Sequence, residues 1–134
     1  MKPNVILTHY ALPEAINLLS TICDVTAVRS RSISAREDLM LLARHAHALM
    51  VVTPERVDEA LLSGCRKLKI VACAFRIPEH IDIAACTRRG IWVSNTIAGR
   101  SGLDAELEAA RNILDVLGGD TPRSALNEVL EPAA

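Results

Sequence analysis

Arg76 is the residue of this sequence best placed to bind a small anion. It follows a continuous apolar run, residues 69–75, and precedes Ile77-Pro78, where the proline ends a strand and imposes an extended backbone. A guanidinium in such a loop can pair with two oxygens of a carboxylate or another oxyanion. The alternative, an arginine that is only solvated in a surface loop, stays open.

Four histidines are the other side chains suited to acid–base or metal chemistry. His9 and His80 each come near the carboxyl end of an expected strand, the side of a parallel sheet that binds ligands. For His80 the first turn of a helix is the favoured place. His45 and His47 are two residues apart at an expected helix end and would not share a face, which favours surface or capping roles over metal binding.

Three familiar ligand-binding patterns are absent. The sequence contains no G-x-G-x-x-G fingerprint, so no nicotinamide-dinucleotide site is encoded. The first expected loop, T-H-Y-A-L-P at residues 8–13, lacks the hydroxyl-rich and glycine-rich character of a flavin-phosphate loop. Thr8-His9 and Thr53-Pro54 stand where a receiver domain needs acidic residues, which excludes a magnesium-assisted phosphoryl acceptor.

The elements around Arg76 form a strand–helix–strand unit. The unalternating apolar run at 69–75 indicates a strand covered on both faces. Residues 79–89 have helical spacing of apolar positions and end at Arg88-Arg89-Gly90, a basic and glycine-containing helix end. Residues 91–93 begin another strand, so we expect a parallel, right-handed βαβ crossover.

The remaining segments repeat this alternation of strands and helices. We expect strands at 4–8, 24–28 and 48–52, and helices at 13–22, at 34–45, from Thr53-Pro54-Glu55 to Gly64, and at 103–117. The expected apolar face of the last helix consists of Leu103, Leu107, Ala110, Leu114 and Leu117. We expect this helix to pack beside the first one, and residues 120–134 to follow the surface as a tail that frays at its end. The pattern predicts an α/β fold, a flavodoxin-like doubly wound five-stranded parallel sheet of order 2-1-3-4-5 with helices on both faces.

Composition limits the domain count, the partners and the cellular compartment that we expect for this protein. The 134 residues fit one domain, half of them are hydrophobic, and the formal net charge is −1. With so little net charge and so few aromatic residues, neither nucleic acid nor membrane is an expected partner. The start of the chain lacks a signal peptide, which favours a cytoplasmic protein. Cys23, Cys65, Cys73 and Cys86 are therefore expected to be reduced core residues, with two disulfides as the alternative.

Two segments resemble one enzyme family. Residues 67–96, KLKIVACAFRIPEHIDIAACTRRGIWVSNT, look like the substrate-domain signature of the D-2-hydroxyacid dehydrogenases. Within them, ACTRRGIW is especially similar to the phosphite dehydrogenase branch. Residues 105–127, AELEAARNILDVLGGDTPRSALN, resemble the helix and tail with which that family's chain returns to its first domain.

The resemblance implies that an internal part of the family pattern is missing. In the family, an NAD-binding Rossmann domain with the catalytic arginine, glutamate and histidine lies between the two segments, whereas here Thr96 directly precedes Ile97. The expected organisation is therefore one substrate-binding domain, residues 1–134, joined from parts 1–96 and 97–134. An engineered excision is the favoured origin and a natural deletion is the alternative. No cofactor is expected in this chain, although the parent enzymes use NAD.

The resemblance also indicates substrate-contacting residues. The family's loop after the fourth strand corresponds to Phe75, Arg76 and Ile77, and the loop after the third strand corresponds to Thr53 and Pro54. The usual glycine of the first loop is absent, and Arg76 stands at the branch's lysine position. The backbone amides that would hold a carboxylate or phosphite are thus expected to be arranged differently from those in the family.

We therefore expect an isolated substrate-binding domain with no catalytic residues and no hydride transfer by itself, from an NAD-dependent 2-hydroxyacid or phosphite dehydrogenase. One alternative is half of a complemented dehydrogenase, to which a separate Rossmann domain docks. A second is a homo-oligomer that covers newly exposed apolar surface. A third is a small module that binds a carboxylate or oxyanion through Arg76.

Overall fold

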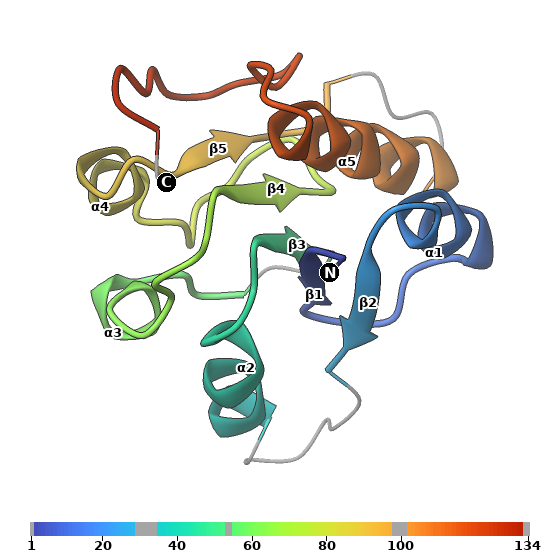
Figure 1. Cartoon of the computed structure of the whole chain (residues 1–134), viewed down its shortest axis with the longest axis horizontal. Helices are drawn as coiled ribbons and strands as arrows, with labels where there is room; N and C mark the ends of the chain where they lie inside the picture. The colour runs from blue at the N-terminus through green and yellow to red at the C-terminus, as the bar shows by residue number, and fades with distance from the viewer. Residues whose placement is uncertain (1, 29–34, 53–54, 98–101, 133–134) are drawn as a thin grey trace.

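Five short strands form one parallel sheet at the centre of the molecule (Figure 1). They are β1 (Asn4–Leu7), β2 (Asp24–Ala27), β3 (Ala48–Val51), β4 (Ile70–Cys73) and β5 (Trp92–Ser94). Their order is β2-β1-β3-β4-β5, which confirms the prediction from the sequence. The computed structural model describes residues 2–28, 35–52, 55–97 and 102–132.

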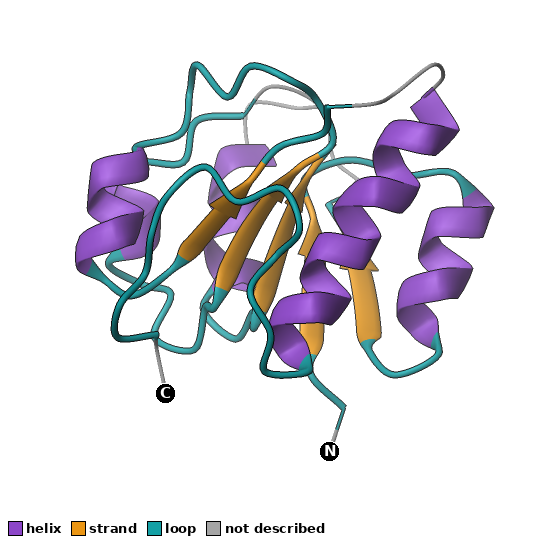
Figure 2. Ribbon diagram, turned by 90° about the horizontal axis from the view of Figure 1, so that it is seen from above, coloured by secondary structure: helices purple, strands orange, loops and turns teal. Residues whose placement is uncertain are grey.

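Five helices cover the two faces of the sheet. They are α1 (Pro13–Ser20), α2 (Ala35–Ala43), α3 (Glu59–Leu62), α4 (Ile83–Arg88) and α5 (Gly102–Leu117). Helices α1 and α5 lie side by side on one face, as expected, and α2, α3 and α4 cover the other (Figures 1 and 2). None of the helices in the described ranges is long and apolar enough to cross a lipid bilayer.

The burial of the strands follows their place in the sheet. Every residue of β3 and β4 is buried, because helices cover both of their faces. The edge strand β2 has no buried residue and alternates between exposed and half-buried positions. The four cysteines are buried and free of disulfides, in agreement with the expected reduced state.

Two predicted helix starts are wrong. Helix α3 begins at Glu59 with Asp58 as its N-cap, not at 53–55, and α4 begins at Ile83 after Asp82, not at residue 79. His80 accordingly lies in a turn rather than in the first turn of a helix.

An isolated parallel bridge between Val57 and Ile81 explains both late starts. The Val57 N–H donates to the His80 carbonyl at 2.9 Å, and the Asp82 N–H donates to the Val57 carbonyl at 2.8 Å. These backbone groups hold the two segments extended, so neither can join a helix. The aspartate that follows each segment then caps the helix, because its carboxylate accepts the N–H of Leu61 or Ala85.

Helix α5 is present as predicted, but its buried face differs. Leu103, Leu107, Leu114 and Leu117 are only half-buried. The buried residues of this helix are Glu106, Ala109, Ala110, Asn112, Ile113 and Val116. Polar side chains are tolerated there because each meets a backbone donor: Glu106 Oε1 accepts the Leu12 N–H at 2.5 Å, and Asn112 Oδ1 accepts the Ser124 N–H at 3.1 Å.

The tail after α5 covers the outer edge of β5 (Figure 2). Ala125 forms an antiparallel bridge with Ser94, and the Leu126 N–H donates to the Val93 carbonyl at 2.7 Å. Asn127 completes the contact, because its Oδ1 accepts the Val93 N–H at 2.9 Å and its Nδ2 donates to the Ile91 carbonyl at 3.0 Å. The expected surface tail thus also protects an open strand edge.

Candidate functional site

The loop that follows β4 carries three of the five predicted contact residues. Phe75 is half-buried against the core on the α2–α4 face, whereas Arg76 and Ile77 are exposed. Thr53 and Pro54, the other two, lie outside the described residues. The structure therefore places Phe75, Arg76 and Ile77 together at the carboxyl edge of the sheet.

The segment after β5 holds the carbonyl groups of this loop. The Thr96 N–H donates to the Phe75 carbonyl at 3.1 Å, and Asn95 Nδ2 donates to the Arg76 carbonyl at 2.9 Å. The Thr96 hydroxyl donates to the Cys73 carbonyl at 3.0 Å. Both side chains are buried, so the segment forms a fixed support under the exposed part of the loop.

The N–H groups of the same loop are free to bind a ligand. The Ala74 N–H still belongs to the sheet, since it donates to the Val51 carbonyl at 2.9 Å. The next three, those of Phe75, Arg76 and Ile77, find no acceptor in the described part of the chain. Successive backbone N–H groups beside a cation are a common way to bind an anion. The loop therefore offers donors even though it lacks the expected glycine.

Charge pairing leaves Arg76 as an available cation at this edge. Arg36 is engaged with Asp58 at 2.8 Å, and Arg56 contacts the same carboxylate at 2.9 Å. Burial raises the pKa of Asp58, but the N–H of Leu61 and the two arginines outweigh it, so its pKa is lowered overall. Arg76 forms no ion pair with any described residue, and its guanidinium can receive an oxyanion.

The residues at the end of β1 mainly stabilise the fold. The Thr8 hydroxyl accepts the Val52 N–H at 3.1 Å and joins the ends of β1 and β3. His9 is half-buried and meets Tyr10 edge to face, with ring centres 6.1 Å apart. At the opposite edge, His47 Nδ1 accepts the Asn4 N–H at 2.9 Å, so this side chain bonds to the start of β1 rather than to a helix end. Nowhere in the described ranges do three His, Cys, Asp or Glu side chains gather as metal ligands.

Sequence reasoning missed the supporting residues Asn95 and Thr96. Asn95 is 8% exposed, and its Oδ1 is buried without a hydrogen-bond partner. The signal was present as a polar triplet, Ser94-Asn95-Thr96, that ends an otherwise apolar strand. Buried polar groups in such a place hold neighbouring loops or meet a ligand.

The loop after β1 does not fit the phosphates of a dinucleotide. Helix α1 begins with Pro13, which has no N–H, and Leu12 already donates its N–H to Glu106. No glycine in residues 8–13 allows close backbone approach to a pyrophosphate. The residues of this loop therefore do not fit a nicotinamide cofactor.

Comparisons with known proteins agree with one another. The family model described as "D-isomer specific 2-hydroxyacid dehydrogenase, catalytic domain" matches residues 5–127, a range that begins within β1 and extends past α5. A glyoxylate reductase from Aeropyrum pernix is 35% identical over 120 residues, an alignment that covers 85% of this chain and 36% of that protein. The chain thus spans about a third of the length of this relative.

Solved structures share the fold. The PH0520 protein from Pyrococcus horikoshii has a TM-score of 0.65 at 24% identity, covering 74% of this chain and 28% of that one. A 3-phosphoglycerate dehydrogenase from Entamoeba histolytica, solved with NAD+ bound, has a TM-score of 0.60 at 21% identity. That match covers 72% of this chain and 33% of the other.

Proposed function

Because this chain belongs to the D-isomer specific 2-hydroxyacid dehydrogenase family, we propose that it is the substrate-binding part of such an enzyme and holds its substrate's carboxylate at Arg76. One observation carries the proposal. A guanidinium and three successive N–H groups, all without partners among the described residues, share one loop at the carboxyl edge of the sheet. A carboxylate supplies the negative charge and the acceptor oxygens that such a loop requires.

A small 2-oxo or 2-hydroxy acid is the proposed substrate class. The relative from Aeropyrum pernix is named a glyoxylate reductase, which supports glyoxylate as the first ligand to test. The similarity of ACTRRGIW to the phosphite dehydrogenase branch makes phosphite the alternative. Both are small oxyanions, so the same guanidinium can serve either.

We further propose that the chain transfers no hydride by itself. The residues after β1 do not fit a dinucleotide, and the chain spans about a third of its relative's length. The match to the family model across 5–127 supports one substrate-binding domain joined at Thr96–Ile97, with an internal cofactor domain excised, by engineering or by natural deletion. Four unpaired buried thiols support a cytoplasmic setting.

The experiment is a ligand titration followed by thermal unfolding and by NMR of the backbone amides. Millimolar glyoxylate is expected to raise the melting temperature and to shift the amide signals of Phe75, Arg76 and Ile77. Arg76→Ala should abolish both effects and Arg76→Lys should retain part of them. Arg111→Ala, which removes an exposed cation from α5, is the matched control. Equal responses of the Arg76 and Arg111 variants would reject the proposed carboxylate site at Arg76. A larger shift with phosphite than with glyoxylate would favour phosphite as the substrate.

Exposed isoleucines at the same edge support the alternative of a docked partner. Ile77 and Ile97 are each 65% exposed, and the Thr96–Phe75 hydrogen bond brings their segments together. In this reading, a separate NAD-binding domain or a second copy of the chain covers them. Sedimentation over a range of concentrations tests whether a second copy of the chain binds. A fall in NADH absorbance after addition of a Rossmann domain, NADH and glyoxylate tests whether an NAD-binding domain docks. Ile77→Ser/Ile97→Ser should weaken whichever association occurs.

A further inference from the structure

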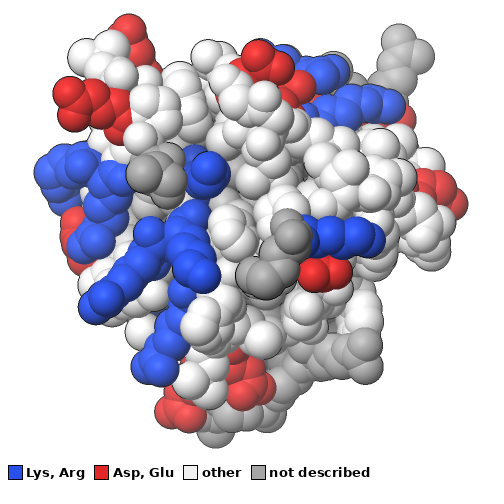
Figure 3. Space-filling model, in the orientation of Figure 1, with Lys and Arg blue, Asp and Glu red and all other residues white. Residues whose placement is uncertain are grey.

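Cationic side chains gather at the edge of the sheet opposite to the Arg76 loop. They lie where β3, β4 and β5 begin, and we call this surface the basic amino edge. Its members are Arg44, Arg66, Lys67, Lys69, Arg88 and Arg89. Figure 3 shows the blue side chains concentrated on this part of the molecule, over the ends of α2, α3 and α4.

Strand register places Lys69 in the middle of this edge. Ala48 pairs with Ile70, and Ile70 pairs with Trp92, so the residues that precede them, His47, Lys69 and Ile91, lie side by side on neighbouring strands. The Lys69 N–H donates to the His47 carbonyl at 2.8 Å, and the Trp92 N–H donates to the Lys69 carbonyl at 3.0 Å. The sheet thus fixes the backbone of Lys69, and the other cations reach this edge from the helix ends and connections around it.

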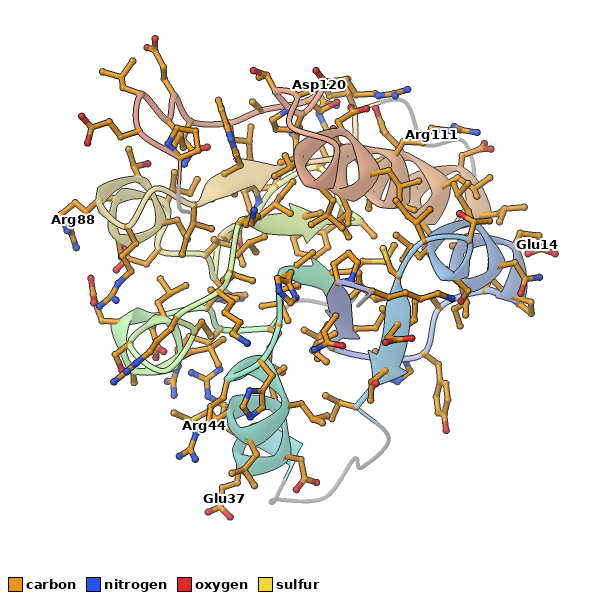
Figure 4. The ribbon with its side chains drawn as sticks, in the orientation of Figure 1. Glu14, Glu37, Arg44, Arg88, Arg111 and Asp120 are labelled. Atoms are coloured by element: carbon orange, nitrogen blue, oxygen red, sulfur yellow. The ribbon has the colours of Figure 1, made fainter. Side chains whose placement is uncertain are left out.

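Arg44 reaches this edge from the end of α2. A Cβ placed on Gly64 would lie 3.8 Å from the Arg44 Cγ, so the stem of Arg44 packs against the end of α3. The segment that follows carries Arg66 and Lys67, both exposed. In Figure 4, Arg44 and Arg88 project from the same side of the molecule, whereas Arg111 lies on α5 at the other side.

Most of this positive charge has no partner in the described residues. Arg88 and Arg89 share Glu59, each at 2.8 Å. Arg44, Arg66, Lys67 and Lys69 form no ion pair with any described residue. Burial lowers the pKa of His47, and the charges of Lys67 and Lys69 lower it further.

Helix dipoles account for only part of the cluster. Arg44, Arg88 and Arg89 lie at helix ends, where a cation complements the negative end of a dipole. Arg66, Lys67 and Lys69 lie in the connection from α3 to β4, and α3 has only four residues. Its dipole is too small to require three further cations, so they remain available for an external anion.

We propose that the basic amino edge binds ligands with two or more adjacent phosphate groups, and that Arg44, Arg66, Lys67 and Lys69 pair with those phosphates. A cluster of cations without ion-pair partners among the described residues favours a chain of phosphates over a single phosphate, because each added anionic group meets another unpaired charge. This site is separate from the carboxylate site, which lies at the other edge of the sheet.

A cavity beside Lys69 offers a place for a group attached to the phosphates. It has a volume of about 590 Å³ and is lined by Lys69, Trp92, Val116 and Val129, with Asp120 and Glu128 at its wall. Its size lies within the usual range for small-molecule sites. Trp92 is the single tryptophan of the chain, so its fluorescence reports on this cavity.

Titration of the full chain at low ionic strength tests the proposal. We expect inorganic triphosphate to bind at least about tenfold more tightly than orthophosphate by calorimetry, since tenfold requires only about 1.4 kcal/mol. Arg66→Gln/Lys67→Gln, at two exposed positions, should weaken triphosphate binding about tenfold without changing the melting temperature of the free protein. Arg111→Gln and Arg76→Ala should bind triphosphate like the parent chain.

A parallel titration with ATP identifies the source of the phosphates. Tighter binding of ATP with a change in Trp92 emission indicates a nucleoside polyphosphate with its nucleoside in the cavity. Equal affinity without an emission change indicates that the phosphate chain alone is recognised. Equal affinity for orthophosphate and triphosphate would overturn the proposal, as would an unaltered Arg66→Gln/Lys67→Gln variant. Tighter binding of a single-stranded oligonucleotide than of triphosphate would also overturn it.

Discussion

The side-chain amide of Asn95 donates a hydrogen bond to the backbone carbonyl of Arg76 across 2.9 Å. This contact joins the segment after β5 to the loop after β4, although the two residues are 19 positions apart in sequence. Because Asn95 is buried and Arg76 is exposed, a fixed residue supports the residue that we propose meets the ligand.

Replacement of Asn95 should therefore affect both stability and ligand binding. Asn95→Ala is expected to cost about 1 kcal/mol, the usual net value of one hydrogen bond, and to weaken the response to glyoxylate. Urea unfolding and the glyoxylate titration measure the two effects. Asn17→Ala, at an exposed position of α1 without a side-chain hydrogen bond in the described structure, is the control. If both variants bind glyoxylate like the parent chain, Asn95 does not position the loop.

Asn127 should be important for the edge of β5. Its side chain bonds to the backbone of Val93 and Ile91 and to the hydroxyl of Thr87 at 2.9 Å. Asn127→Ala is expected to cost about 1–2 kcal/mol and to promote self-association, because the Val93 N–H loses its acceptor. Urea unfolding and sedimentation velocity measure the two effects. Glu128→Ala, at the neighbouring exposed position, is the control. If Asn127→Ala is as stable and as monomeric as Glu128→Ala, the prediction is wrong.

The buried thiols should be inert in the folded protein. Burial raises the pKa of Cys65 to about 11 and those of Cys73 and Cys86 to about 12. The reactive thiolate is therefore scarce near pH 8, and iodoacetamide should label these residues slowly until denaturant is added. Mass spectrometry of the labelled peptides gives the rates. Rapid labelling of Cys73 in the native protein would show that β4 is more accessible than its burial indicates.

Stability should fall on mild acidification because of His47. Burial, followed by the charges of Lys67 and Lys69, lowers the pKa of this histidine from its usual 6.5. Between the folded and unfolded pKa values the unfolded chain binds more protons, so unfolding becomes easier as the pH falls below about 6.5. This loss of stability is complete once the pH is below the pKa that His47 has in the folded protein. NMR titration of the ring measures the pKa of His47 in the folded protein, and urea unfolding at several pH values measures the free energy of unfolding.

The His47→Gln variant serves as the reference for that experiment. It removes the titrating ring, so the part of the pH dependence that begins near 6.5 should disappear. A wild-type curve that stays parallel to the variant's curve would mean that His47 titrates alike in the folded and unfolded states.

The site could be predicted only in part. The position of Arg76 in a loop could be predicted because Pro78 ends an apolar strand, and the family resemblance added Phe75 and Ile77; the structure places that loop at the carboxyl edge. Asn95, Thr96 and Glu106 were missed because their roles depend on partners far away in sequence. As substrate contacts all five residues remain predictions, and Thr53 and Pro54 also lie outside the described part of the chain.

The sequence by itself determined the layered architecture. Apolar runs in β3 and β4 leave no polar face for solvent, so helices must cover both sides of the sheet, and short crossovers then set the strand order. Only the tertiary structure decided the starts of α3 and α4 and the buried face of α5. The Val57–Ile81 bridge and the contacts of Glu106 and Asn112 join distant segments, and no local pattern encodes them. The same holds for charge, because a net value of −1 conceals a cluster of cations that the fold gathers at one edge of the sheet (Figure 3).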